Sequence, residues 1–237
     1  MLVIAHRGAS GHAPENTLAA FRRALEMGAR AIEFDVHQTA DHELVVAHDD
    51  DLKRCAGVKR KLKAMRWAGE AEAVDVGTWF DERFRGERLP RLQDVLDLAP
   101  EPVELHLELK HGSSVYPGIE RRVLDCVRRA GAQRRVLVSS FDHAALFSVR
   151  SLDGNARLGY LLGLTRLARA FAEMKEISAE SLNVSQRQAA SRVVKAAHER
   201  GYKVLVYTVN APEERDRLAR LGVDGVFTNY PELDLWR

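Results

Sequence analysis

The chain has 237 residues, of which 46% are hydrophobic and 30% are charged, a composition typical of a globular protein with one or two domains. Its 36 Lys and Arg residues nearly balance its 34 Asp and Glu residues, so that the net charge is only +2. This balance argues against a nucleic-acid-binding surface and against a polybasic membrane anchor.

The amino terminus runs from Met1 directly into His6-Arg7-Gly8 and lacks the long apolar stretch of a signal peptide. No apolar run approaches the length of a membrane span, so we expect no stable membrane insertion. These features predict a cytoplasmic protein.

Short β-branched runs alternate with helical periodicity along the whole chain. Predicted strands cover Leu2–Ala5, Ala31–Val36, Val103–Leu109, Val136–Ser139, Arg157–Leu161, Ser181–Val184, Lys203–Tyr207 and Gly225–Thr228. Predicted helices cover Thr17–Met27, Leu92–Ala99, Tyr116–Arg129, His143–Ser151, Arg166–Met174, Gln188–Arg200 and Pro212–Leu221. Eight such units in a chain of this length predict an α/β fold, a (β/α)₈ TIM barrel formed by residues 1–237 as a single domain. A doubly wound open sheet is the alternative.

One further run, Glu43–Ala47, follows the second strand too closely for a parallel crossover. It therefore predicts a hairpin partner of that strand, with His48 placed opposite Glu33 and Phe34. Residues of about 50–90 hold no clear strand-helix unit and are interpreted as an inserted segment after this hairpin. On a barrel, such insertions usually build the rim of the active site.

Acidic side chains alternate with apolar ones in two of the predicted strands. In Ala31–Val36, Glu33 and Asp35 share the face opposite Phe34, and we expect both carboxylates to point into the barrel. Strand three repeats the pattern, with Glu108 and Lys110 nearest its carboxyl end. Buried like charges repel and lose hydration, and a hard divalent cation relieves both problems. A buried ion network, or a strand with one polar face, is the alternative interpretation.

The first strand ends in His6-Arg7-Gly8, close to the expected position of His48. Two histidines beside a metal site suit general acid–base chemistry, because the imidazole pKa lies near neutrality. Arg7 is suited to bidentate binding of an anionic oxygen. Phosphoester hydrolysis is therefore the predicted reaction, and the chain has no nucleotide-binding or serine-hydrolase motif that would favour another.

The chain resembles the glycerophosphodiester phosphodiesterases. The matching stretches are His6-Arg7-Gly8, Pro14-Glu15-Asn16-Thr17, Glu33-Phe34-Asp35, His48-Asp49, Glu108-Leu109-Lys110, Ser140-Phe141, Thr208-Val209-Asn210 and residues 222–231. They span nearly the whole chain in the order typical of that family.

The resemblance implies that Glu33, Asp35 and Glu108 bind one divalent cation, Mg²⁺ or Ca²⁺. It also implies that His6 and His48 are the general acid and base. The reaction implied is hydrolysis of glycerophosphodiesters, such as glycerophosphocholine and glycerophosphoethanolamine, to glycerol 3-phosphate and an alcohol.

Four residues are predicted to bind the substrate. Arg7 and Lys110 would hold the phosphate, as the resemblance implies. Phe141 would line the glycerol pocket, although a core position is the alternative. Tyr207 stands where the family usually has Trp, and its hydroxyl adds a polar tip to the pocket wall.

Two further activities are weighed beside the main prediction. A lysophospholipase D would use the same metal site, whereas a catalytically silent barrel would only bind phosphodiesters. Retention of both histidines and all three carboxylates argues against the silent barrel. The predicted partner is a small-molecule substrate and not a nucleic acid, and a homodimer stays open.

Overall fold

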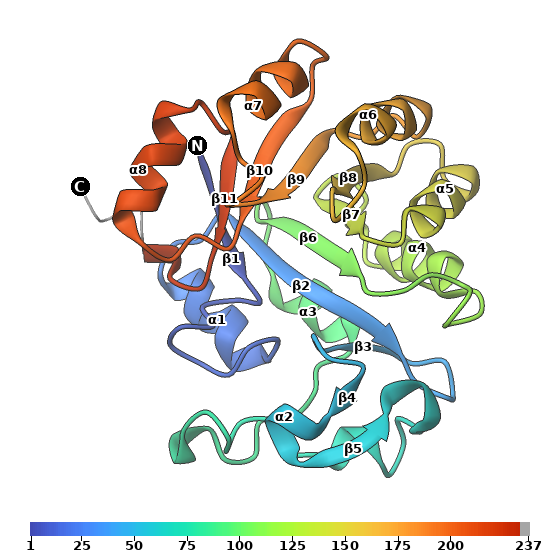
Figure 1. Cartoon of the computed structure of the whole chain (residues 1–237). Coiled ribbons are helices and arrows are strands. Elements are labelled where there is room, and N and C mark those ends of the chain that lie inside the picture. The colour runs from blue at the N-terminus through green and yellow to red at the C-terminus, as the bar shows by residue number, and fades with distance from the viewer. Residues whose placement is uncertain (233–237) are drawn as a thin grey trace.

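A computed structural model describes residues 1–232, in which eight parallel strands form a closed barrel (Figure 1). The strands are β1 (Leu2–His6), β2 (Ala31–Gln38), β6 (Glu104–Leu109), β7 (Val136–Ser140), β8 (Arg157–Leu161), β9 (Ser181–Ser185), β10 (Lys203–Tyr207) and β11 (Gly225–Thr228). They pair in chain order, and β11 closes the barrel by pairing with β1. This arrangement confirms the predicted (β/α)₈ barrel and is not an open sheet.

Seven helices surround the barrel (Figure 1). They are α1 (Leu18–Glu26), α3 (Leu92–Leu98), α4 (Ile119–Arg129), α5 (His143–Leu152), α6 (Leu167–Glu176), α7 (Ser191–His198) and α8 (Pro212–Arg220). Each overlaps a predicted helix, with differences at the ends. Helix α4, for example, begins three residues later than Tyr116, because Gly118 has a left-handed backbone (φ 76°) and the helix starts only at Ile119.

The alternation along the barrel strands divides apolar from polar side chains. In β6, Leu105, Leu107 and Leu109 are fully buried in the main hydrophobic core, together with apolar side chains of the surrounding helices. A second, small apolar cluster of Ile4, Ala31, Leu205 and Phe227 comes from four strands of the barrel. The charged side chains Glu33 and Asp35 of β2 and Glu108 of β6 lie on the other face of these strands, toward the carboxyl ends, where barrel enzymes have their active sites.

At the start of helix α1, the neighbouring residues Asn16 and Thr17 have different roles. The Thr17 hydroxyl caps the helix by accepting a hydrogen bond from the Ala20 amide (3.2 Å). Asn16 has a left-handed backbone (φ 57°), and its side-chain nitrogen donates to Asp35 Oδ2 (2.8 Å). Thr17 is therefore the helix cap, and Asn16 belongs to the candidate site.

The predicted hairpin is present. Strand β3 (Leu44–Val46) runs antiparallel to β2, with Val36 opposite Val46 and Gln38 opposite Leu44. The next amide, that of Ala47, donates to the Asp35 carbonyl oxygen (3.1 Å). His48 consequently follows at the level of Phe34, as the sequence pattern predicted.

The segment after β3 has short elements and a hydrophobic cluster of its own, in the lower part of Figure 1. Its elements are β4 (Asp51–Leu52), α2 (Lys53–Ala56), β5 (Val58–Lys61) and 3₁₀ turns at Leu62–Ala64, Ala71–Ala73 and Glu82–Phe84. The cluster consists of Val45, Ala47, Leu52, Leu62, Met65, Ala71, Val76 and Leu89. Two of these residues flank Val46 of β3, so the segment packs directly onto the hairpin. In the described part of the chain, no helix is long and apolar enough to cross a membrane.

Gly8 occupies a position that a larger residue cannot take without strain. Its φ is +80°, and an added Cβ would lie 2.7 Å from the backbone carbonyl carbon of Ala20. We expect Gly8→Ala to lose at least ~1–2 kcal/mol of unfolding free energy from the left-handed backbone alone. At ~2–4 °C per kcal/mol, thermal unfolding will show a lower Tm. The control is Gly154→Ala, since nothing lies within 4 Å of its Cβ, and an equal Tm for both variants would contradict the prediction.

Candidate active site

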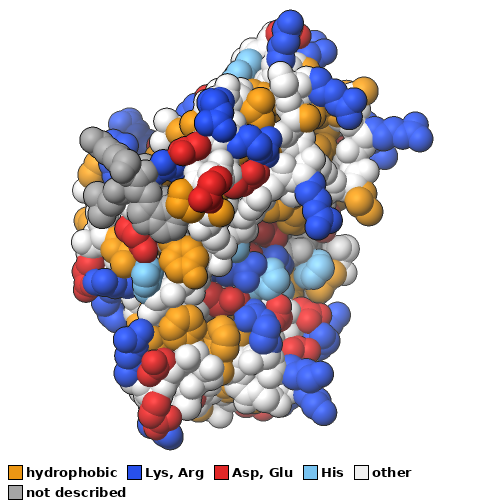
Figure 2. Space-filling view, turned by 60° about the vertical axis from the view of Figure 1, so that its left-hand side comes forward, with side chains coloured by type: hydrophobic (Ala, Val, Ile, Leu, Met, Phe, Trp, Pro, Cys, Tyr) orange, Lys and Arg blue, Asp and Glu red, His pale blue; other side chains and the backbone are white. Residues whose placement is uncertain are grey.

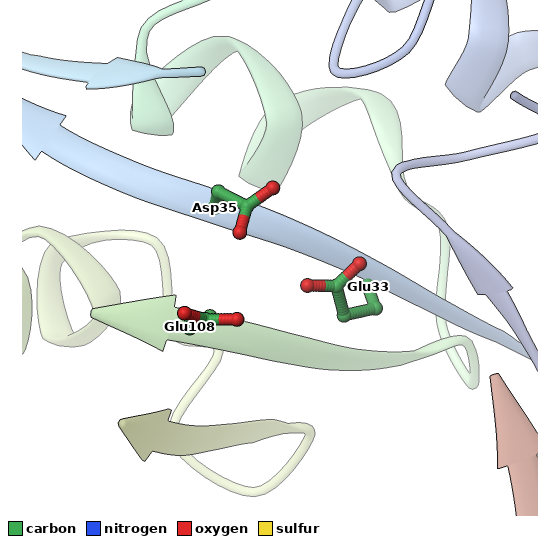
Figure 3. Close-up of side chains that lie close together, drawn as sticks. All are labelled: Glu33, Asp35 and Glu108. Carbon is green, nitrogen blue, oxygen red and sulfur yellow. The ribbon is translucent and has the colours of Figure 1, made fainter. Parts of the chain in front are cut away.

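Three carboxylates from two neighbouring strands face one another inside the barrel (Figure 3). Glu33 and Asp35 lie on β2, and the register places Asp35 directly beside Glu108 of β6. One oxygen of each residue lies within 4.8 Å of the others. Asp35 is only 1% exposed and Glu33 only 5% exposed, so the cluster is held away from bulk water.

The three carboxylates repel one another when ionised, and burial removes the hydration that would stabilise their charge. Burial raises the pKa of Glu33 well above its usual range, and the neighbouring Asp35 and Glu108 raise it further. Burial and Asp35 likewise raise the pKa of Glu108 to about 7. Burial alone would raise the pKa of Asp35 as well, but the charges of Lys110 and Arg7 outweigh it and hold that pKa below its usual value. A set of carboxylate oxygens in this state fits a hard divalent cation such as Mg²⁺ or Ca²⁺.

Two basic side chains lie against the same carboxylates. Lys110 Nζ lies 3.2 Å from Asp35 Oδ1 and 2.9 Å from Glu108 Oε1. Arg7 Nε lies 3.3 Å from Asp35 Oδ2, and the Arg7 backbone amide donates to Glu33 Oε2 (2.9 Å). Both cations therefore border the acidic cluster, where they are placed to bind an anionic group.

His6 is held by one ring nitrogen. Its Nδ1 lies 2.8 Å from the side-chain oxygen of Asn229, which accepts, so Nδ1 carries the proton and Nε2 has the free lone pair. Nε2 lies 4.0 Å from Glu33 Oε2. Burial and the nearby Arg7 charge lower the pKa of His6 to about 4, which keeps the imidazole neutral at physiological pH.

His48 has a similar arrangement, with a carboxylate in place of the amide. Its Nδ1 donates to Asp49 Oδ1 (2.7 Å), which leaves Nε2 free. Burial lowers the pKa of His48. Behind it, His37 Nε2 donates to the His48 carbonyl oxygen (3.1 Å). His37 is buried, and this hydrogen bond holds the backbone of His48 in place.

A cavity of about 170 Å³ opens over the acidic cluster. It is lined by His6, Arg7, Glu33, His48, Glu108, Lys110, Ser139, Phe141, Leu161, Asn183, Tyr207, Thr208 and Phe227. Eight of the nine predicted site residues line it, and the ninth, Asp35, is buried next to them against Arg7 and Lys110. Figure 2 shows acidic, basic and histidine side chains meeting in a hollow of the surface.

The two predicted aromatic residues form one wall of the cavity. Phe141 is 44% exposed, so it is a pocket residue and not a core aromatic. It meets Tyr207 edge to face, with ring centroids 6.1 Å apart. Burial raises the pKa of the Tyr207 phenol to about 12, which keeps it protonated and able to donate a hydrogen bond.

Several residues of the site are not among the nine predicted site residues. Glu15, Asn16, Asp49 and Asn229 each hold another site residue through the contacts described above or below, and all four belong to the stretches that carry the family resemblance. Ser139 and Asn183 line the cavity from β7 and β9. The two-residue alternation of those strands is the signal that would have placed them inside the barrel.

The closed barrel, with charged and aromatic side chains gathered at the carboxyl ends of its strands, defines the class of the protein as a (β/α)₈-barrel enzyme. The model of the glycerophosphoryl diester phosphodiesterase family matches residues 6–233. The chain belongs to this family, which confirms the resemblance and the prediction of an enzyme of the phosphodiesterase class.

Individual relatives match over nearly the full length. A glycerophosphodiester phosphodiesterase of Caldanaerobacter subterraneus is 36% identical over 232 residues, which cover 98% of this chain and 95% of the relative. A glycerophosphodiester phosphodiesterase of Bacillus subtilis is 30% identical, over 98% of this chain and 85% of the relative. The solved structure of an Oleispira antarctica phosphodiesterase in complex with the product sn-glycerol-3-phosphate is similar to this fold, with a TM-score of 0.90 at 28% identity, over 98% of this chain and 94% of that one.

Proposed function

We propose that this chain hydrolyses glycerophosphodiesters, such as glycerophosphocholine and glycerophosphoethanolamine, to glycerol 3-phosphate and an alcohol. The observation that supports this most is the buried cluster of Glu33, Asp35 and Glu108, bordered by Arg7 and Lys110. The carboxylates are suited to bind a metal cation, and the two basic side chains are suited to bind an anion. A phosphodiester bound beside a metal ion would make both kinds of contact. The product bound by the Oleispira antarctica relative, sn-glycerol-3-phosphate, is the phosphate monoester that hydrolysis of a glycerophosphodiester would release.

The three carboxylates would hold one divalent cation, Mg²⁺ or Ca²⁺. Bound there, such a cation supplies electrostatic stabilisation of the negative charge that develops on the phosphoryl oxygens. Arg7 and Lys110 bind the non-bridging oxygens of the phosphate and orient it toward the histidines.

His6 and His48 are the proposed acid–base pair. Each has its Nδ1 fixed, by Asn229 or by Asp49, so that Nε2 is the atom that exchanges a proton. One histidine, starting neutral, accepts at Nε2 the proton of the attacking oxygen, which belongs either to water or to a glycerol hydroxyl; in the second case water then opens the resulting cyclic phosphate. The other histidine starts as the imidazolium and donates its Nε2 proton to the leaving oxygen of the alcohol. Phe141 and Tyr207 contact the non-reacting part of the substrate, and the Tyr207 hydroxyl offers it one hydrogen bond.

The single-domain organisation of residues 1–237, with the segment at about 50–90 inserted, is part of the same proposal. Its support is that Val45 and Ala47 on the hairpin share a hydrophobic cluster with the segment. The cytoplasmic location and a homodimer stay predictions.

A coupled assay for glycerol 3-phosphate tests the proposal. We expect release of glycerol 3-phosphate from a panel of glycerophosphodiesters. Cleavage of lysophosphatidylcholine would give a lysophosphatidic acid and choline, so a choline assay follows that substrate, and we expect little choline from it. Comparable release of a lysophosphatidic acid from the lysolipid would favour the lysophospholipase D alternative. Binding of glycerophosphodiesters without any turnover, in the presence of Mg²⁺ or Ca²⁺, would favour the silent barrel.

A further inference from the structure

Arg54, which the segment after β3 supplies from its short helix α2, makes three hydrogen bonds to two carboxylates. Its Nε donates to Asp49 Oδ2 (2.8 Å). Its two terminal nitrogens donate to the two oxygens of Glu15, at 2.6 and 3.1 Å. The planar guanidinium thereby holds one carboxylate in bidentate fashion and a second from its side, a geometry that a lysine cannot reproduce.

Each of these carboxylates in turn holds a residue of the proposed reaction. Asp49 uses its other oxygen, Oδ1, to accept from His48 Nδ1 (2.7 Å). Glu15 Oε1 accepts from an Arg7 terminal nitrogen (3.0 Å). One continuous series of contacts therefore joins a proposed acid–base histidine to a proposed phosphate-binding arginine, and Arg54 is its central member.

Both carboxylates are kept ionised within this series. Burial would raise the pKa of Glu15, but Arg54 and Arg7 outweigh it and lower that pKa. Burial would likewise raise the pKa of Asp49, but His48 and Arg54 outweigh it and lower the pKa. Arg54 itself lies over the Trp79 ring, with its guanidinium carbon 5.6 Å from the ring centroid, so a second part of the segment supports it.

We propose that Arg54 is a positioning residue that sets His48 and Arg7 relative to each other, so that the acid–base group and the phosphate-binding group act on the same substrate pose. The proposal rests on the proposed function and assigns the segment after β3 a part in the chemistry beyond that of a rim. Arg54 does not line the cavity, and its effect passes through Asp49 and Glu15.

A purely structural surface ion pair leads to a different expectation. The Arg54 side chain is 41% exposed, and exposed ion pairs contribute little to stability. A positioning role instead predicts a large loss of activity with a nearly unchanged Tm, because a small misplacement of a reacting group is costly to catalysis.

The first test compares Arg54→Ala with Arg60→Ala. Arg60 lies in the same segment and pairs with Glu70, away from the cavity, which makes it the matched control. We expect Arg54→Ala to lose ~10- to 100-fold in kcat/KM, with effects on both kcat and KM, and Arg60→Ala to retain the wild-type values. Added guanidinium ion, far below denaturing concentrations, should restore part of the lost kcat, and Arg54→Lys should restore less than full activity. Wild-type kcat/KM in Arg54→Ala would overturn the proposal.

The second test does not depend on how well Arg54→Ala folds. Glu15→Gln and Asp49→Asn are combined in a double-mutant cycle, because these two residues are joined through Arg54. In the wild-type background we expect the combined effect of the two substitutions on kcat/KM to differ by ~3-fold or more from the product of the single effects. In an Arg54→Lys background, which lacks the guanidinium that bonds both carboxylates, we expect the two effects to be additive. Additive effects in the wild-type background would overturn the proposal.

The two tests separate this proposal from the proposed function. An active wild-type enzyme that is indifferent to Arg54 overturns the positioning role alone. A wild-type chain that hydrolyses no phosphodiester in the presence of Mg²⁺ or Ca²⁺ overturns the proposed function, and the positioning role with it.

Discussion

Replacing His48 or His6 with alanine lowers kcat by ~10²–10⁴-fold, the usual contribution of a general acid or base. The expectation follows from the geometry of each ring, since Nδ1 is fixed by Asp49 or Asn229 and only Nε2 remains to exchange a proton with the substrate. Steady-state kinetics with a glycerophosphodiester measure the effect, and circular dichroism and Tm show that the fold is retained.

The control for this prediction is His198→Ala. His198 is on α7 and pairs with Asp224, outside the cavity, and its removal should leave kcat unchanged. Turnover within a few-fold of the wild type in His6→Ala or His48→Ala would remove that histidine from the mechanism.

Removal of divalent cations with EDTA is the second change with a large expected effect. Burial and the neighbouring carboxylates raise the pKa of Glu33 and of Glu108 even with Lys110 and Arg7 beside the cluster, which favours a metal ion there. A metal ion contributes several kcal/mol to stabilising a phosphoryl transition state. Because each 1.36 kcal/mol corresponds to a factor of ten, turnover should fall by ~10³-fold or more. Added Mg²⁺ or Ca²⁺ should restore it.

Calorimetry tests the same site without any substrate. Glu108→Gln should bind Mg²⁺ or Ca²⁺ more weakly than the wild type. Glu104→Gln, on the same strand but paired with Arg157 at the other end of the barrel, should bind as the wild type does. Unchanged affinity in Glu108→Gln, or full activity in metal-free protein, would contradict the assignment of these carboxylates as ligands.

The barrel was predictable because its signals are local. Each strand carries a short run rich in apolar residues, and the two-residue alternation in Ala31–Val36 already divides Phe34 from Glu33 and Asp35. The hairpin was predictable from loop length alone, since a run so close to the second strand can only pair with it antiparallel. That one deduction placed His48 beside the carboxylates, where the structure has it.

The contacts that join the site together were not predictable in the same way. Glu15 and Arg54 lie 39 residues apart, and they meet only because the segment after β3 folds back over the first loop. That segment has no periodic pattern, and its small cluster is assembled from single apolar residues spread between Val45 and Leu89. The role of Asn16 is hard to predict for another reason. Asn and Thr are both good helix caps, and only the structure, in which the Thr17 side chain accepts from the Ala20 amide, shows that Thr17 is the cap.

The segment's attachment to the hairpin has a consequence for anyone who would exchange parts between relatives. The Val46 amide donates to the Pro90 carbonyl oxygen (2.9 Å), and the Ala40 amide donates to the Met65 carbonyl oxygen (2.7 Å). Val45 also forms an isolated antiparallel β-bridge with Arg91. A chimera with junctions at the visible edges of the insertion, near residues 50 and 90, would combine the hairpin of one protein with the inserted segment of another. The hairpin would then lose these native contacts and pack against a foreign segment. The smallest transferable cassette therefore runs from about Thr39 to Arg91, and it carries His48 along with it.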